Sequence, residues 1–220
     1  MQQRKSKKAA SKSMLKRRGM MLVLAAPPGG GKTTIAREIL KHDSDTMLSV
    51  SATTRDRRPG EVEGRDYYFV NEDKFKDMID NGQMLEYAFV YNKSMYGTPK
   101  APVEKALANG KDVIFDIDWQ GHLKLKAMSE NDVVSIFILP PTFNDLDKRL
   151  HVRNRDNEND IELRLLKSKD EMSHYKEFQY VIINADLDEA VDKVRAILEA
   201  ERLKRNRLTN IAEFVEDVCS

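Results

Sequence analysis

The chain has 220 residues, of which 40% are hydrophobic and 33% are charged, and its formal net charge is +1. This size and composition predict one α/β domain with small insertions rather than two independent domains. The single cysteine, Cys219, excludes a disulfide framework and a cysteine-rich metal site. No apolar run approaches the ~18 residues that a membrane-spanning helix needs. We therefore expect a soluble, cytoplasmic protein with no membrane partner.

The basic residues are unevenly distributed, because eight of the 37 lie in residues 1–18, which contain no acidic residue. Such a segment could bind nucleic acid non-specifically or act as a transit peptide. It has no apolar stripe and no aromatic residue that could stack on bases. We therefore expect a disordered basic tail over residues 1–18, a single domain over residues 19–220, and no specific nucleic-acid partner.

A glycine-rich sequence follows the apolar run at residues 20–25. It reads Ala26-Pro27-Pro28-Gly29-Gly30-Gly31-Lys32-Thr33-Thr34 and leads into a helical pattern. A strand, a glycine-rich turn and a helix N-terminus in this order surround a phosphate with backbone N–H groups. Lys32 adds a positive charge for the β- and γ-phosphates, and the Thr33 hydroxyl suits magnesium. We interpret the segment as a P-loop; the alternative is a glycine-rich turn with a chance Lys-Thr pair.

Strand patterns alternate with helical patterns along most of the chain. Strands are predicted at 20–26, 47–51, 112–117, 133–139 and 180–184, and helices near 32–42, 99–109, 119–129, 142–152, 158–176 and 186–205, with a short terminal helix in 206–220. This alternation predicts a parallel sheet covered by helices on both faces. Residues 52–98 contain loops, short aromatic strands and one helix near 71–81, so we expect an inserted subdomain. The polar stretch at 153–160 predicts a mobile lid.

The loop at residues 49–61 predicts a second anion-binding site. Arg55 and Arg58 lie three residues apart and could together bind one phosphate, to which Tyr67 could add a hydroxyl donor. A solvated basic loop is the alternative. Because the loop accompanies a P-loop, we favour a protein that binds two phosphorylated ligands.

Two carboxylates come at the end of the strand predicted at 112–117. The carboxyl ends of parallel strands open onto the ligand crevice, so Asp116 is the candidate magnesium ligand. Asp118 could face the same crevice or cap the following helix, which is a common role for Asp.

Arginines surround the polar stretch at 153–160. They are Arg149, Arg153, Arg155 and Arg164. Cations that arrive as a lid closes can accelerate phosphoryl transfer by ~10³ to 10⁵, although some of these arginines could form ordinary ion pairs. No Ser/His/Asp or Cys/His set accompanies them. A phosphate acceptor that is already anionic at pH 7 needs no strong general base, so this absence fits phosphoryl transfer.

Together these motifs resemble the guanylate kinases, which are P-loop nucleoside monophosphate kinases, over residues 20–205. The resemblance is carried by the P-loop, residues 51–61, 64–69, Glu86, 96–98, 116–121, 137–141, Arg149, Arg153 and 182–184. It implies a P-loop three-layer α/β fold in which a parallel sheet is covered by helices. The core would comprise 19–51, 99–140 and 171–205, the GMP-binding subdomain 52–98, and the lid 141–170.

The resemblance also implies an activity, the transfer of the γ-phosphate of MgATP to GMP or dGMP. By this resemblance the GMP phosphate is bound by Arg55, Arg58, Tyr67 and Tyr96, and the guanine by Ser51, Glu86, Thr98 and Asp118. ATP is bound by Pro27, Pro28, Gly29, Gly30, Gly31, Lys32, Thr33, Thr34 and Asn184, and magnesium by Thr33 and Asp116. The implied catalytic residues are Lys32, Arg55, Arg149, Arg153 and Arg164.

Two further expectations come from comparison with the family pattern. The interval from Glu86 to Tyr96 is one residue longer than usual, so we expect a bulge in that hairpin. Guanylate-kinase-like domains also occur as non-catalytic scaffolds that bind phosphopeptides, and these typically lack a working P-loop. The presence of Lys32, Thr33 and Asp116 favours the enzyme.

Overall fold

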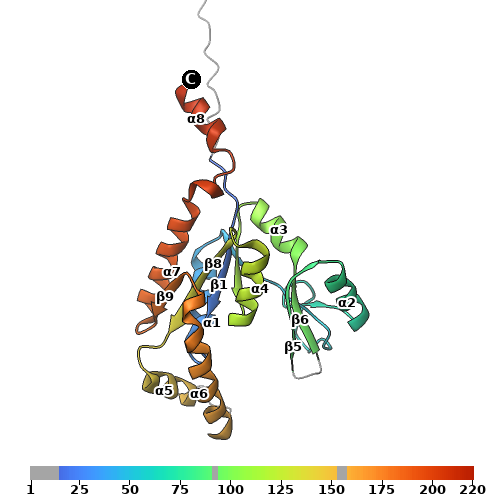
Figure 1. The fold of residues 1–220 in the computed structure, drawn as a ribbon, viewed down its shortest axis with the longest axis vertical. Coiled ribbons are helices and arrows are strands. Elements are labelled where there is room, and N and C mark those ends of the chain that lie inside the picture. The colour runs from blue at the N-terminus through green and yellow to red at the C-terminus, as the bar shows by residue number, and fades with distance from the viewer. Residues whose placement is uncertain (1–14, 91–93, 153–157) are drawn as a thin grey trace, which may run out of the picture.

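The computed structural model describes residues 15–90, 94–152 and 158–220, and its central feature is a five-stranded parallel sheet (Figure 1). The strands, in spatial order, are β2 (Thr46–Leu48), β7 (Asp112–Asp116), β1 (Met21–Ala25), β8 (Val133–Leu139) and β9 (Tyr180–Ile183). Each neighbouring pair is parallel. The predicted α/β fold with a parallel sheet is therefore confirmed.

Helices cover both faces of this sheet, which makes three layers. Helices α1 (Lys32–His42) and α7 (Leu187–Arg202) pack on one face, and α3 (Lys100–Ala108) and α4 (Trp119–Ser129) on the other. Successive side chains of a strand point to opposite faces. In β1, Leu22 and Leu24 accordingly contact the core beneath α1, whereas Met21 and Val23 contact the core beneath α3.

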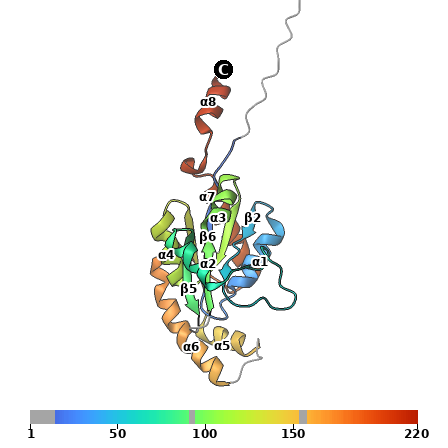
Figure 2. The same cartoon turned by 90° about the vertical axis from the view of Figure 1, so that its right-hand side faces the viewer.

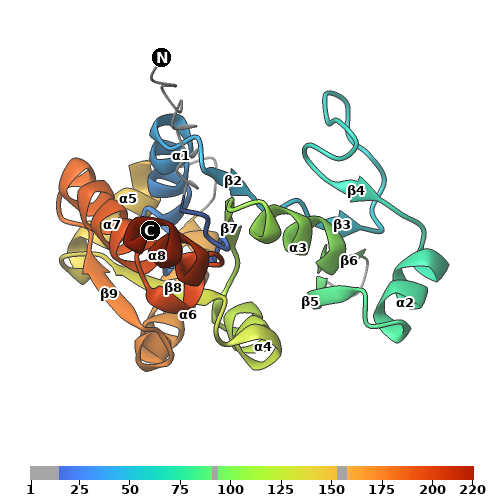
Figure 3. The ribbon, with the colours of Figure 1, turned by 90° about the horizontal axis from the view of Figure 1, so that it is seen from above.

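A second, four-stranded sheet lies beside the first (Figure 3). Its strands, in spatial order, are β4 (Tyr68–Phe69), β3 (Ala52–Thr53), β6 (Ser94–Pro99) and β5 (Met84–Val90), and α2 (Glu72–Asp80) accompanies them. It has its own small core around Phe75, Met84 and Met95. The strand predicted at 47–51 ends early, at Leu48, because the chain crosses to this sheet, where Ser51 accepts a backbone hydrogen bond from Tyr68.

The β5–β6 hairpin does not contain the expected bulge between Glu86 and Tyr96. Residues 86–90 pair with residues 94–98 in one continuous register, and the register shifts only between Met84 and Glu86. That prediction is wrong for the paired strands, because the regular ladder there leaves no unpaired residue. The connecting residues 91–93 lie outside the described part of the chain.

Helices α5 (Phe143–Val152) and α6 (Glu158–Ser173) form the end of the molecule that Figure 1 shows opposite the C-terminus. Leu146 and Leu150 of α5 pack against Ile161 of α6. The 3₁₀ turn η1 (His174–Glu177) follows α6 and leads into β9. Residues 153–157, the centre of the predicted mobile lid, lie outside the described residues.

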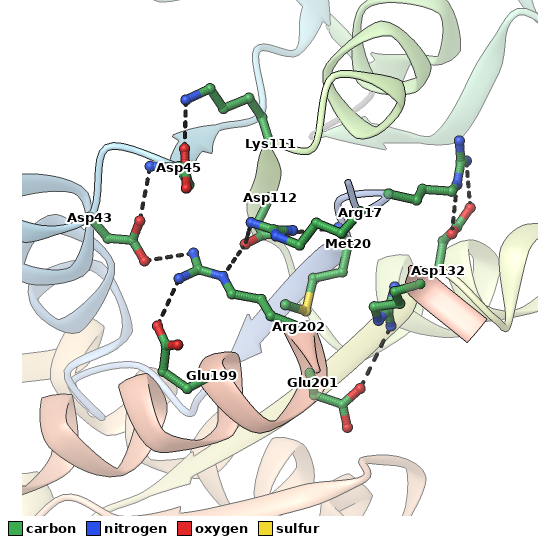
Figure 4. A network of polar contacts seen from close by, with 12 residues as sticks. Arg17, Met20, Asp43, Asp45, Lys111, Asp112, Asp132, Glu199, Glu201 and Arg202 are labelled. Atoms are coloured by element: carbon green, nitrogen blue, oxygen red, sulfur yellow. Dashed lines mark hydrogen bonds and ion pairs between the residues drawn. The ribbon is translucent and has the colours of Figure 1, made fainter. Parts of the chain in front are cut away.

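The disordered tail predicted over residues 1–18 is wrong at its last residues, because they pair with the body. Arg17 forms an antiparallel bridge with Leu208 and donates two hydrogen bonds, of 2.7 and 3.0 Å, to the fully buried carboxylate of Asp112. Arg202 of α7 donates to the same carboxylate at 2.8 Å (Figure 4). Residues 1–14 lie outside the described part of the chain.

The C-terminal residues form η2 (Arg205–Arg207) and α8 (Ile211–Cys219), and α8 projects away from the body (Figures 1 and 2). Val215 and Val218 on this helix are exposed. Within the described ranges, no helix combines the length and apolar character that crossing a membrane requires.

Candidate active site

The P-loop connects β1 to α1 in the predicted way. Gly29 and Gly31 have φ values of 84° and 102°, which L side chains rarely adopt, and Gly30 closes the turn by donating to the Pro27 carbonyl at 2.8 Å. No side chain caps α1, and its first turn has no acidic residue. The first backbone N–H groups and the positive end of the helix dipole are therefore available to an anion.

Lys32 and Asp116 meet at the carboxyl edge of the sheet. The Lys32 Nζ lies 2.5 Å from Oδ1 of Asp116 and donates to the Ile117 carbonyl at 3.3 Å. The Thr33 hydroxyl donates to Oδ2 of Asp116 at 3.2 Å. This meeting follows from topology, because β1 and β7 are parallel neighbours and their ends lie side by side. The structure thus brings together three of the predicted site residues.

Asn184 and Arg149 lie beside the P-loop. The buried side-chain amide of Asn184 donates to the Gly30 carbonyl at 2.9 Å, and the Asn184 backbone carbonyl accepts from Nη2 of Arg149 at 2.8 Å. A pocket opens beside them; it is lined by Gly29, Gly31, Thr34, Lys148, Arg149, Val152, Asn184 and Leu187. The amide of Asn184 therefore supports the loop, and the residue forms part of the pocket wall.

A second pocket contains Glu86. Glu86 and Thr98 are cross-strand partners, and the Thr98 hydroxyl donates to Oε1 of Glu86 at 2.7 Å. Burial raises the pKa of the Glu86 carboxyl, and the Thr98 hydrogen bond opposes this shift only in part. The pocket is lined by Glu86, Tyr87, Ala88, Ile117, Asp118, Gln120, Gly121 and Lys124.

Asp118 has both of the roles that the sequence left open. Its Oδ1 accepts from the Gly121 backbone N–H at 2.9 Å and so caps α4, while the residue also lines the Glu86 pocket. Ser51 is not among the residues that line this pocket. Lys124, which the sequence analysis did not select, lies in the pocket wall, and its charge favours the ionised form of Glu86.

Arg55, Tyr67 and Tyr96 form a third cluster. The guanidinium carbon of Arg55 lies 5.0 Å from the centre of the Tyr67 ring, and the two tyrosine rings are 6.0 Å apart. Arg58 adds its backbone N–H, which donates to Glu61, whereas its side chain is exposed. The hydrogen bonds that Arg55 donates to Glu61 hold the pKa of Arg55 above its usual range.

Two carboxylates in the site region were given no role of their own by the sequence analysis. Glu61 binds Arg55. The sequence feature that could have identified it is an acidic residue directly after Gly60, at the end of an arginine-rich loop. Glu171 on α6 has a pKa that burial raises, and it interacts electrostatically with Lys32 and Asp118. No local sequence pattern marks Glu171, because only the packing of α6 brings it near the P-loop.

The remaining predicted arginines are placed in part. Arg149 lies on α5 next to the P-loop, and Leu146 and Leu150 of the same helix lie against Gly29. Arg164 lies on the exposed side of α6. Arg153 and Arg155 lie outside the described residues.

Comparisons with known proteins agree with this geometry. The guanylate kinase family model matches residues 18–201. Guanylate kinases of Rhodopseudomonas palustris strain BisB18 and Nitrobacter winogradskyi are 51% and 50% identical over 187 residues, which are 85% of this chain and 85% of each relative. The crystal structure of guanylate kinase from Anaplasma phagocytophilum matches with a TM-score of 0.71 and 37% identity, covering 93% of this chain and 97% of that one. The chain belongs to the guanylate kinase family.

Proposed function

We propose that this protein transfers the γ-phosphate of ATP to GMP, and less efficiently to dGMP, giving ADP and GDP. One observation carries the proposal. Asp116 contacts Lys32 of the P-loop, and Asp118, two residues further on, lines the pocket that contains Glu86. Residues 116–118 therefore join a cradle for a phosphate donor to a polar pocket for an acceptor.

Guanine recognition is assigned to Glu86, with Thr98, Asp118 and Ser51. An ionised carboxylate can accept from both N1–H and the exocyclic amine of guanine, whereas adenine has no such pair of donors on that edge. A buried carboxylate left without these donors loses hydrogen bonds, and polar sites of this kind discriminate by ~10⁴ to 10⁵. The Thr98 hydrogen bond supports this role, because it fixes the position of Oε1.

The acceptor phosphate is assigned to Arg55, Arg58, Tyr67 and Tyr96. The guanidinium fork and the two phenol hydroxyls supply donors that suit phosphate oxygens. The clustering of Arg55 with both tyrosine rings supports this assignment.

The donor nucleotide is assigned to the P-loop, from Pro27 to Thr34, and to the pocket beside Asn184. The uncapped N-terminus of α1 and the side chain of Lys32 would bind the ATP phosphates. The pocket between Gly29 and Leu187 would receive the nucleoside.

Thr33 and Asp116 fit a magnesium ion. Both offer oxygen ligands, which magnesium prefers, and their side chains are in direct hydrogen-bond contact. Magnesium, when bound there, would neutralise charge on the β- and γ-phosphate oxygens. Lys32 would then exchange Asp116 for a phosphate oxygen.

Phosphoryl transfer would depend on positive charge rather than on a general base. Lys32, Arg55, Arg149 and Arg164 are the described cations assigned to the transferring group, and Arg153 is the fifth. A transferring phosphoryl group spreads charge over its equatorial oxygens, so cations placed around it stabilise the transition state. The packing of α5 against Gly29 supports a role for Arg149, because it places that helix beside the P-loop.

An ADP-release assay with GMP, dGMP, AMP, CMP and UMP as acceptors tests the proposal. We expect the highest kcat/KM with GMP, a lower value with dGMP and almost none with AMP. Equal rates with AMP and GMP would contradict the role of Glu86. A non-catalytic phosphopeptide-binding scaffold would release no ADP with any acceptor.

A further inference from the structure

Residues 55–61 form a closed loop in which the end of the segment returns to its beginning. Gly60 adopts a φ of 87°, a conformation that favours glycine and reverses the chain. Glu61 donates its backbone N–H to the Arg58 carbonyl at 3.2 Å, and its own carbonyl accepts from Nε of Arg57 at 2.5 Å. The loop thereby directs the Glu61 side chain back toward Arg55.

Glu61 binds Arg55 through both carboxylate oxygens. Nη1 of Arg55 donates to Oε2 at 2.9 Å, and Nη2 donates to Oε1 at 2.5 Å. Oε2 also accepts from the Arg58 backbone N–H at 2.8 Å. The side chains of Arg55 and Glu61 are only 13% and 20% exposed. The pair is therefore a shielded, two-point contact rather than a loose surface ion pair.

One edge of the Arg55 guanidinium does not contact Glu61. Nη1 also donates to the Asp56 carbonyl at 2.8 Å, so both of its hydrogens are used. A guanidinium has five N–H donors, so Nε–H and the second hydrogen of Nη2 form the other edge of the fork, which does not contact Glu61. The Tyr96 hydroxyl oxygen accepts a hydrogen bond from this guanidinium, and the rings of Tyr67 and Phe69 lie 5.0 and 5.8 Å from its carbon. A phosphate oxygen that binds this edge would therefore share it with Tyr96 or replace the Tyr96 contact.

We propose that Glu61 is a positioning residue for the acceptor phosphate: it holds Arg55 so that the edge of the guanidinium opposite Glu61, beside Tyr67 and Tyr96, meets the phosphate. This inference rests on the proposed function of the cluster as the GMP phosphate site. A free arginine side chain has many rotamers, and fixing one of them before binding reduces the entropy lost when the ligand binds.

The competing possibility is that Glu61 occupies the place of the phosphate and must leave when GMP binds. The number of contacts argues against it, because displacement would break three hydrogen bonds to the carboxylate. These contacts lower the pKa of Glu61 to about 2, chiefly through Arg55 and then through the Arg58 N–H. The carboxylate is thus ionised and bound throughout the neutral range. A phosphate can bind the other edge of Arg55 without disturbing it.

The variant Glu61→Gln tests the proposal. Its amide keeps the size of the carboxylate but cannot accept from both Nη atoms of Arg55. We expect KM for GMP to rise about tenfold, with KM for ATP unchanged, because one well-placed charged contact is lost. The inhibition constant of guanosine, which has no phosphate, should stay at the wild-type value. An unchanged or lowered KM for GMP would overturn the proposal, and a lowered value would identify Glu61 as a competitor.

Asp66→Asn is the matched control in the same subdomain. Oδ2 of Asp66 accepts from Nε and Nη2 of Arg65 at 3.1 and 2.7 Å and from the Val62 backbone N–H at 2.7 Å, so this carboxylate also joins an arginine to a backbone N–H, but on an exposed arginine and through one oxygen. We expect its KM for GMP to match wild type. If KM for GMP rose as much in Asp66→Asn as in Glu61→Gln, both carboxylates would only maintain the fold of this segment. The same conclusion would hold for Glu61 if Glu61→Gln weakened guanosine binding as much as GMP binding.

A double-mutant cycle with Arg55→Lys tests whether Glu61 acts through Arg55. A lysine cannot present a two-edged fork, so Glu61→Gln should add little to the effect of Arg55→Lys on KM for GMP. Additive effects would show that Glu61 does not act through Arg55. Failure of the proposed function gives a different result, because the wild-type protein would then neither bind nor phosphorylate GMP.

Discussion

The side chain of Asn184 is hydrogen-bonded to the carbonyl oxygen of Gly30 at 2.9 Å, across 154 positions of sequence. A β-carbon on Gly31 would lie 2.2 Å from the same amide nitrogen, so the loop and the amide fit closely together. Asn184 also accepts from Arg149 through its backbone carbonyl. One residue at the end of β9 therefore joins the P-loop to helix α5.

Asn184→Ala should raise KM for ATP by about tenfold, because leaving a buried carbonyl without its donor costs about 1–3 kcal/mol. KM for GMP should be unchanged, since the acceptor pocket lies on the other side of β1. Asn109→Ala is the control, because its amide donates to the Lys105 carbonyl at an exposed helix end. Steady-state kinetics with each nucleotide varied in turn gives both constants. A rise in KM for GMP of the same size would contradict this assignment.

Glu86→Gln should lower kcat/KM for GMP by about 100-fold, because a neutral amide cannot accept from two guanine donors and hydrogen bonds to charged groups contribute about 1.5–3 kcal/mol each. KM for ATP should stay at the wild-type value, which would show that the P-loop is intact. Thr98→Val is the companion variant, and it should have a smaller effect, because it removes only the group that orients Oε1. Retention of wild-type kcat/KM in Glu86→Gln would exclude Glu86 from guanine recognition.

The same variant makes a prediction about stability. Burial raises the folded-state pKa of Glu86 above its unfolded value, so the folded protein favours the protonated carboxyl. The stability that the protonated Glu86 carboxyl contributes is complete below the unfolded pKa and is lost as the pH rises through the folded pKa. At pH 7, Glu86→Gln should therefore resist urea at least as well as wild type. The difference in unfolding free energy between Glu86→Gln and wild type should therefore be more favourable to the variant at pH 7 than at pH 4. The opposite order would contradict the raised pKa.

Lys32→Ala should lower kcat by about 10² to 10³, the typical effect of removing one group that stabilises the transition state. GMP binding, measured by calorimetry without ATP, should be unchanged. Lys41→Ala on the same helix is the control, because that lysine is exposed and pairs with Glu38 on the helix surface. If Lys32→Ala instead abolished GMP binding, the separation of the donor and acceptor sites would be wrong.

Local sequence patterns predicted several elements of the parallel-sheet core. The helices at 32–42 and 119–129 and the strand at 133–139 have the predicted bounds, because each combines an apolar periodicity with clear end signals. The meeting of Lys32 with Asp116 was also predictable, since the ends of parallel strands share one edge of a sheet.

Contacts between distant segments could not be predicted in this way. The sequence places Arg17 in a predicted disordered basic tail, because nothing near it in sequence reveals the buried carboxylate of Asp112. Glu171 is similar, since only the packing of α6 brings it toward Lys32. Glu61 is an intermediate case, because its partner Arg55 is six residues away but the turn at Gly60 was needed to bring the two together.

Asp112→Asn should lower the free energy of unfolding by about 3 kcal/mol, because removing one partner of a buried ion pair leaves the other charge uncompensated. Arg17 and Arg202 both depend on this carboxylate, and Met20 donates its backbone N–H to it. Asp45→Asn is the matched control, because Asp45 pairs with Lys111 at the surface, where such pairs contribute less than about 1 kcal/mol. Urea unfolding of both variants measures the difference. Asp112 lies at the start of β7, whereas Asp116 of the site lies at its other end. The value of kcat/KM per folded molecule should therefore not change. Equal stability of the two variants would show that the network in Figure 4 does not anchor the N-terminal segment and α7 to the sheet.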